Sequence, residues 1–345
     1  MKRITTLLAC TACVSTMGLA ASAASAQETI TLKFAMAVPP THYTAVAGGQ
    51  FFMDRAVELS GGRLKFEWYP GEQLGKAKDL LSLAQAGLAD IVDVVPSYVS
   101  DKLPLTGVAE LPGQTDSSCE GTKVMYALTR PGKLLAEKDF APQKVRVLMA
   151  ATLAPYKILT ATDPVKSLDD MSGLKIRSSG GATDGTIRAL GAVSVRLAGP
   201  EINESLRRGT IDGAMYPFMS LRPFGIDSIR YAVGGANVGT LTTSFLISES
   251  KYKQLPLDIQ KALDQAGKEA GENYCNYIDT HEKKEIEAMT EITTTTLSPE
   301  EAKRWKDVLD ATKSEWAEGL DKRRKAGSEA VAAWDTEMAS VRAGK

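Results

Sequence analysis

The segment from 174 to 217 alternates short apolar strands with helices, and this order restricts the fold more than any other part of the sequence. It predicts a strand ending near Arg177, a helix, a strand over 193–197, a second helix and a third strand ending near Pro217. Strands and helices in this order predict a parallel sheet covered by helices. Ligands of such sheets bind just beyond the carboxyl ends of the strands. Arg177 therefore occupies a candidate binding position.

The first part of the chain repeats this organisation. Strands are predicted over 30–37, 64–69 and 90–95, with helices that end near Ser60 and Ala86 between them. The third strand is mostly apolar, which is typical of a central strand. A chain of 345 residues is too long for one ordinary core. We therefore expect an α/β protein with two similar lobes.

Further predicted elements connect the lobes. Strands over 145–151 and 156–161 lead out of the first lobe, and an extended segment over 238–248 leads back, so that strands form the hinge. Helical periodicity runs from Pro256 towards Met289, about 50 Å of helix, which is long enough to span both lobes. Other predictions are a helix over 117–137, a strand over 292–296, a helix over 299–317 and a C-terminal helix. The expected boundaries are 27–152 plus 242–282 for the first lobe and 153–241 plus 283–345 for the second.

The N-terminus is typical of a secretory signal peptide. Basic residues precede a weakly apolar span, and small residues follow it, which predicts cleavage after Ala26, with Ala23 as the alternative. A lipoprotein box ending at Cys10 lies too close to the N-terminus to leave an apolar region before it. Residues 1–26 are therefore expected to be removed on export, leaving a soluble protein in the periplasm.

Charge and residue counts exclude several kinds of site. Without residues 1–26 the chain has 39 basic and 42 acidic side chains, a net charge of −3, which does not favour a nucleic-acid partner. Cys119 and Cys275 remain, and they can be a disulfide or two buried thiols. The only histidines, His42 and His281, have no cysteine or acidic cluster at metal-ligand spacing. No metal site is expected.

Enzyme and nucleotide sites are weakly supported. Gly180, Gly181 and Gly185, with Glu201 about twenty residues on, distantly resemble a phosphate-binding loop. The spacing is not G-x-G-x-x-G, and no Lys-Ser or Lys-Thr pair follows. G-x-S-x-G is also absent. We expect no catalytic residue and no cofactor, with an exported nucleotide-dependent enzyme as a disfavoured alternative.

Four motifs in order resemble a known family. They are Gln73-Leu74-Gly75 with Gly87-Leu88-Ala89-Asp90; Gly173-Leu174-Lys175-Ile176-Arg177; Ala189-Leu190-Gly191-Ala192; and Pro200-Glu201 with Ser205-Leu206-Arg207-Arg208-Gly209-Thr210-Ile211-Asp212-Gly213. The chain is similar to the periplasmic solute-binding proteins of tripartite ATP-independent periplasmic (TRAP) transporters, of the dicarboxylate-binding type. The resemblance implies a monomer with a periplasmic-binding-protein fold that closes over an organic acid and delivers it to membrane permease subunits. A sensor-partner protein of the same fold is the alternative.

The resemblance also implies site residues. The family's carboxylate-binding arginine falls on Arg177, whose guanidinium fork suits a planar carboxylate. A second basic group twenty residues upstream falls on Lys157, and Glu72 neighbours a turn that lines the cleft. Tyr216 stands where many members have asparagine, and Asn203 stands where tyrosine is frequent. The tyrosine hints at an apolar or aromatic portion in the ligand and disfavours sialic acid.

Positions at strand ends add further candidates. His42 and Tyr43 follow the first predicted strand, where a ligand-facing loop is expected. Thr242 and Thr243 lie in the segment that returns to the first lobe, and their hydroxyls could donate hydrogen bonds. The ligand-binding prediction therefore comprises Arg177, Tyr216, Lys157, His42, Tyr43, Glu72 and Thr243.

Overall fold

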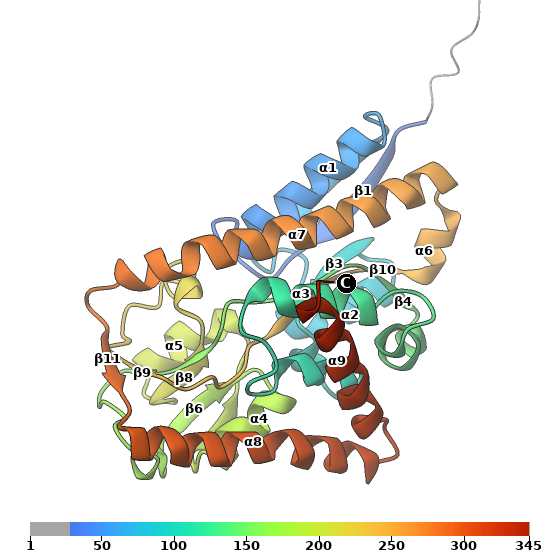
Figure 1. The fold of residues 1–345 in the computed structure, drawn as a ribbon. Helices are drawn as coiled ribbons and strands as arrows, with labels where there is room; N and C mark the ends of the chain where they lie inside the picture. The colour runs from blue at the N-terminus through green and yellow to red at the C-terminus, as the bar shows by residue number, and fades with distance from the viewer. Residues whose placement is uncertain (1–27, 345) are drawn as a thin grey trace, which may run out of the picture.

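A computed structural model describes residues 28–344, so the predicted signal peptide lies outside the described residues. The described chain contains two mixed β-sheets, each covered by helices (Figure 1). The first sheet has the order β2-β1-β3-β10-β4 and the second has the order β11-β9-β5-β8-β6-β7. The strands are β1 (Ile30–Ala35), β2 (Leu64–Tyr69), β3 (Ile91–Val94), β4 (Val145–Thr152), β5 (Lys157–Thr160), β6 (Lys175–Ser178), β7 (Val193–Arg196), β8 (Gly213–Tyr216), β9 (Tyr231–Gly234), β10 (Thr242–Ser248) and β11 (Thr293–Thr296).

Both sheets are mixed because strands that carry the chain from one lobe to the other, here called crossing strands, run antiparallel to their neighbours. The strands β2, β1 and β3 run parallel, with Phe34 opposite both Trp68 and Ile91. The crossing strand β10 lies antiparallel between β3 and β4. In the second sheet β6 pairs in parallel with β7 and β8, whereas β5 is antiparallel to β8 and β9. The local strand-helix-strand units are parallel as predicted, and the strands next to the crossings run the other way.

Helices cover both sheets and one of them reaches across both. The described helices are α1 (Phe51–Leu59), α2 (Leu80–Gln85), α3 (Ser118–Leu128), α4 (Ala182–Ala189), α5 (Ile202–Arg207), α6 (Glu249–Gln254), α7 (Leu257–Glu287), α8 (Pro299–Asp321) and α9 (Gly327–Arg342). The 31 residues of α7 extend about 46 Å, beside α1, α3 and β4 at one end and the turn η9 (Phe218–Ser220) of the second lobe towards the other (Figure 1). This confirms the long spanning helix. Within residues 28–344 no helix is long and apolar enough to cross a bilayer.

The C-terminal helix lies elsewhere than we expected. We expected residues 283–345 in the second lobe, but α9 packs against α3 of the first lobe (Figure 1). Trp334 is fully buried there, and its indole Nε1–H donates to the carbonyl of Gln114 at 3.4 Å. Arg342 binds Asp116 at 2.9 Å. The apolar face of α9 is short, so its periodicity did not show which lobe would bury it.

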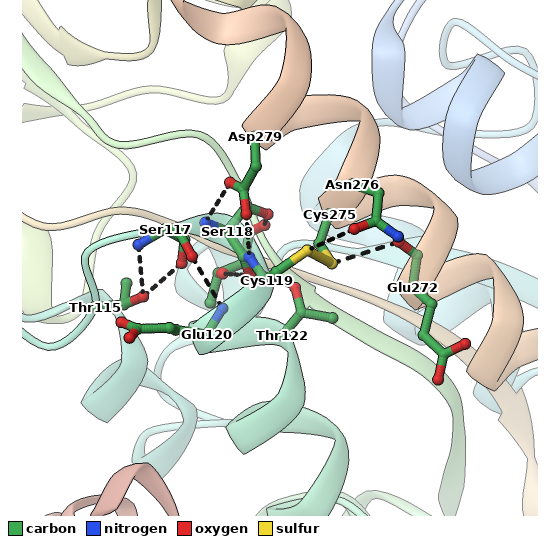
Figure 2. Close-up of a disulfide and its surroundings, with 11 residues drawn as sticks. Thr115, Ser117, Ser118, Cys119, Glu120, Thr122, Glu272, Cys275, Asn276 and Asp279 are labelled. Carbon is green, nitrogen blue, oxygen red and sulfur yellow. Dashed lines mark hydrogen bonds between the residues drawn. A yellow bond between two sulfur atoms is a disulfide. The ribbon is translucent and has the colours of Figure 1, made fainter. Parts of the chain in front are cut away.

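A disulfide joins α3 to α7 within the first lobe. Cys119 and Cys275 are bonded, with Cα atoms 4.8 Å apart, and they lie where α3 begins beside the middle of α7 (Figure 2). Next to the bond, Asp279 accepts hydrogen bonds from the backbone N–H groups of Ser118 and Cys119 at 2.9 and 3.0 Å. An acidic group favours a helix N-terminus, so α7 fixes the start of α3 by both covalent and polar contacts.

Candidate functional site

Arg177 is the centre of the candidate site. It occupies the third position of β6, near the carboxyl end as the sequence predicts, and its side chain is 0% exposed. Nε donates to the carbonyl of Leu197 at 2.9 Å, and Nη1 donates to the carbonyl of Met215 at 3.3 Å. Nη2 donates to the hydroxyl of Tyr98 at 3.3 Å. Two strand ends and a residue of the first lobe therefore hold the guanidinium in place.

The charge of Arg177 has no carboxylate partner among the described residues. Each of its three nitrogens donates one hydrogen bond to a neutral oxygen, and no ion pair includes it. A guanidinium has five N–H donors, so one on each Nη remains for an acceptor. Two donors on neighbouring nitrogens match the two oxygens of a carboxylate. Buried charges are normally paired, so this arrangement favours an anionic ligand.

Three tyrosines surround the guanidinium. Its central carbon lies 5.2 Å from the ring centroid of Tyr216, within cation–π range. Tyr156 contacts Tyr216 edge to face, with ring centroids 6.0 Å apart, and Tyr98 approaches from the first lobe. Burial raises the pKa of both Tyr156 and Tyr216, so both phenols stay protonated. The Tyr156 hydroxyl, on a side chain only 1% exposed, has no hydrogen-bond partner in residues 28–344.

His42 and Tyr43 join the first lobe to the second close to these rings. The His42 Nε2 lies 2.9 Å from the Ser220 hydroxyl, and Tyr43 also binds Ser220, at 3.2 Å. The backbone N–H of Thr44 donates to His42 Nδ1, so Nε2 carries the proton of the neutral ring. Burial lowers the pKa of His42 to about 3. Phe224 lies 5.2 Å from His42 and 6.4 Å from Tyr216 between ring centroids, which connects this pair to the arginine.

Lys157 shares the face of the second sheet that Arg177 occupies. Lys157 pairs with Tyr216 across the strands, Arg177 pairs with Ala214, and alternate residues of one strand point to the same side. Lys157 is half-buried and is close enough to Glu282 to oppose the effect of burial, which raises the pKa of that carboxyl to about 7. Lys157 therefore lies on the same sheet face as Arg177, two strands away.

The structure places two of the predicted residues away from this group. The Glu72 carboxylate accepts from the backbone N–H of Ala77 at 2.9 Å and from Lys76 at 2.7 Å. Glu72 is thus engaged within its own turn. The Thr243 hydroxyl donates to Asp93, inside the first sheet. Neither side chain belongs to the group around Arg177.

Sequence reasoning missed Tyr98, Tyr156, Ser220 and Phe224. Tyr98 lies in the helical turn η3 (Pro96–Val99), directly beyond the carboxyl end of β3, so the strand-end rule applied to the first lobe indicates it. Ser220 and Phe224 follow β8 in the same way. Tyr156 lies between β4 and β5, where the chain passes from one lobe to the other. No spacing rule identifies a residue at such a crossing.

Two lobes joined by crossing strands, with a buried arginine and an aromatic lining between them, define a two-lobed solute-binding protein. Within residues 28–344 no group of three or more His, Cys, Asp or Glu side chains is placed to hold a metal ion. The chain belongs to the bacterial extracellular solute-binding protein family 7, whose model matches residues 34–319. It is a solute-binding protein of the TRAP transporter type, as the four motifs predicted.

Known relatives cover nearly the whole chain. It is 28% identical over 325 residues, 92% of its length and 93% of the relative's, to the C4-dicarboxylate-binding periplasmic protein DctP of Rhodobacter capsulatus. Its fold is similar to a TRAP solute-binding protein of Rhodoferax ferrireducens T118 with copurified benzoate, at TM-score 0.80 and 24% identity over 90% of this chain and 98% of that one. A marine metagenome protein specific for aromatic acid ligands, with 3-hydroxybenzoate bound, gives TM-score 0.81 and 23% identity over 91% and 99%. A Bordetella bronchiseptica protein with bound mandelate gives TM-score 0.80 and 22% identity over 90% and 99%.

Proposed function

We propose that this protein captures a monocarboxylate with a ring or other apolar body between its lobes. The ligand-binding residues are Arg177, Tyr98, Tyr156 and Tyr216, together with His42 and Tyr43 of the first lobe. The observation that carries the proposal is the fully buried arginine without a carboxylate partner in the described chain. Its environment of tyrosine and phenylalanine rings supports an apolar ligand body. The benzoate, 3-hydroxybenzoate and mandelate bound to proteins of the same fold are consistent with that chemistry.

The remaining parts of the proposal concern where the captured acid goes. We propose that residues 1–26 direct export and are removed, and that the monomeric protein delivers its ligand to TRAP permease subunits in the membrane. We further propose that it binds without catalysis and needs no cofactor. Lys157, on the same face as Arg177, could hold a second carboxylate, and the DctP relative binds C4-dicarboxylates. Comparing benzoate with succinate distinguishes the two ligand classes, and the proposal expects the ring acid to bind more tightly.

The test is a binding comparison on the mature chain. Benzoate, 3-hydroxybenzoate, mandelate and succinate are measured by thermal shift and isothermal titration calorimetry. An acid at a hundredfold its Kd adds about 2.7 kcal/mol to stability, enough to raise the melting temperature by several degrees. We expect at least one of the three ring acids to bind more tightly than succinate. Binding of none of the four acids would contradict the proposed ligand class.

Two variants of Arg177 locate the site. Removing a buried charged partner typically costs about 2–5 kcal/mol, so Arg177→Ala should lower affinity at least ~30-fold. Arg177→Lys keeps the charge but loses the two-nitrogen fork, and it should also bind more weakly. Arg188→Ala, at an exposed arginine on α4 of the same lobe, is the matched control. Parental affinity in a folded Arg177→Lys variant would show that the acid binds elsewhere.

A further inference from the structure

Tyr98 is the direct contact between the first lobe and the guanidinium. Its hydroxyl oxygen accepts from Nη2 of Arg177 at 3.3 Å and from the backbone N–H of Gly199 at 2.9 Å. Both donors belong to the second lobe, Arg177 on β6 and Gly199 in the turn after β7. A tyrosine hydroxyl accepts two hydrogen bonds and donates one. Both accepting positions are filled, so the hydroxyl hydrogen remains for an acceptor.

The turn that holds Tyr98 is fixed on both sides. The neighbouring Ser97 hydroxyl donates to the carboxylate of Glu110, which also accepts from the Thr242 hydroxyl of the crossing strand β10 at 3.1 Å. On its other side the turn touches Gly180, where a Cβ would lie 2.7 Å from the Ser97 carbonyl oxygen. Gly180 has φ +101°, a conformation that also favours glycine. The crossing strand β10, through Glu110, and the second lobe, through Gly180, therefore together fix the turn that holds Tyr98.

A second hydroxyl in the same group also lacks an acceptor. Tyr156 is fully buried beside Tyr216, and its hydroxyl has no hydrogen-bond partner within residues 28–344. A buried hydroxyl without a partner is unfavourable, so such groups are usually satisfied by a ligand or water. Around the Arg177 guanidinium, two N–H groups and the hydroxyl hydrogens of half-buried Tyr98 and fully buried Tyr156 thus have no acceptor among the described residues. Oxygens of a carboxylate can accept all four.

We infer that Tyr98 couples closure of the lobes to recognition of the ligand carboxylate. Its hydroxyl donates to the anion that Arg177 holds, while its oxygen accepts from Arg177 and Gly199 only when the lobes are closed. A hydroxyl that accepts hydrogen bonds is polarised and donates more strongly, so the anion and the closed state reinforce each other. The inference rests on the proposed function and adds to it a first-lobe residue that determines affinity. Tyr98 thus binds the ligand carboxylate and holds the two lobes together, and we call its contacts with Arg177 and Gly199 the latch.

The test replaces only the hydroxyl. Tyr98→Phe keeps the ring and removes both the donor and the acceptor, and Tyr126→Phe on α3, whose ring stacks on Arg130, is the matched control. Small-angle X-ray scattering of the ligand-free chains should give a larger radius of gyration for Tyr98→Phe than for the parent and Tyr126→Phe. The two variants should show melting temperatures that confirm folding. Equal radii in all three chains overturn the latch whether or not an acid binds.

Binding kinetics supply the second arm. With benzoate as probe, and 3-hydroxybenzoate or mandelate if that acid binds more tightly, loss of a hydrogen bond to a charged group should weaken affinity about 10-fold to 100-fold. The loss should fall on the dissociation rate, because the lobes must open before the acid leaves and Tyr98→Phe weakens the contact that holds them closed. Binding by the parent with an unchanged dissociation rate in Tyr98→Phe overturns the inference and leaves the proposed function intact. Failure of the parent to bind any acid contradicts the proposed function, and scattering alone then decides the latch.

Discussion

At the scale of single residues, the site is distinguished by a buried charge and a buried hydroxyl that lack partners among the described residues. Arg177 is held by two carbonyls and one phenol, and its charge is balanced by no carboxylate in the described chain. Glu110 is buried near it and binds Ser97 and Thr242. Burial raises the pKa of Glu110 to about 7, so this carboxyl is partly neutral at ordinary pH. In its neutral form Glu110 does not balance the charge of Arg177, which then remains available to an external anion.

Protonation of Glu110 should make stability depend on pH. The pKa of Glu110 is raised from 4.5 to about 7 in the folded protein. Its contribution to the free energy of unfolding is therefore fully present below about pH 4.5 and is lost as pH rises through about 7. Between pH 5 and 8 the free energy of unfolding should fall less in Glu110→Gln than in the parent. The difference between the two falls should be on the order of 3 kcal/mol. The measurement is urea unfolding across that range. Glu315→Gln, at an exposed position on α8, should keep the parental slope.

Other buried groups with shifted pKa values also make the stability depend on pH. Asp93, whose pKa burial also raises to about 7, contributes with the same sign as Glu110. His42, with its pKa lowered to about 3 by burial, has the opposite sign, since its stabilisation is lost as pH falls below about 6.5. The parent and the variant must therefore be compared at each pH. A Glu110→Gln profile parallel to that of the parent would show that this carboxyl does not titrate in the range.

At the scale of elements, local patterns predicted most strands, because alternating residues indicate a strand with one buried face and an apolar run indicates a central strand. The alternation over 64–69 became β2, and the apolar run over 90–95 became the central strand β3. The helix predicted over 117–137 begins as expected, with the Ser117 side chain as cap, but α3 ends at Leu128. Pro131 and Gly132 follow, and neither favours a helix interior. The strand β9 was not predicted, although other strands of four residues were; only its two central residues, Ala232 and Val233, are buried.

The disulfide between α3 and α7 should contribute to stability but not to binding. It links positions 156 residues apart, so the chain-entropy account allows up to about 5 kcal/mol. Both cysteines lie in the first lobe, on α3 and α7, whereas Arg177 lies on β6 of the second lobe. We expect Cys119→Ser with Cys275→Ser to lower the melting temperature markedly and leave the affinity for a bound acid unchanged. Dithiothreitol should lower the melting temperature of the parent and not that of the double variant.

Two results would contradict this account of the disulfide. If reductant has no effect on the parent, the two cysteines are buried thiols, the alternative that the sequence allowed. If the double variant loses affinity while it remains folded, the start of α3 influences the site. Contacts of Asp279 with the N–H groups of Ser118 and Cys119 should hold α3 in place without the bond, which favours an unchanged affinity.

At the scale of the whole molecule, the chain passes between the lobes four times. The crossings are from β4 to β5, from β9 to β10, along α7, and from α8 to α9. The sequence predicted the first three, because extended segments and one long helix were visible in its pattern. The fourth depends on burial of Trp334 against the first lobe, a contact between distant parts of the chain that periodicity does not show. Tyr156, at the crossing from β4 to β5, was missed because no local pattern marks such a position, whereas Tyr98 could have been found from the end of β3.

Repeated crossings should make unfolding cooperative. Neither lobe is one continuous stretch of chain, and α7 and α8 each pack across the division. We expect differential scanning calorimetry to show one transition whose calorimetric and van't Hoff enthalpies agree. Two resolved transitions would show that the lobes unfold separately. Added benzoate should shift the single peak upward without splitting it, since the ligand binds residues of both lobes.

The return of α9 to the first lobe has a practical consequence. The described chain begins with β1 and ends with α9, both in the first lobe, so the second lobe contains neither end (Figure 1). A fluorescent pair fused to the two ends would report almost no change when the protein closes. An optical sensor for this protein needs one dye on an internal surface position of the second lobe, such as Arg188. A protein tethered by its C-terminus would hold the first lobe still and leave the second lobe free to swing.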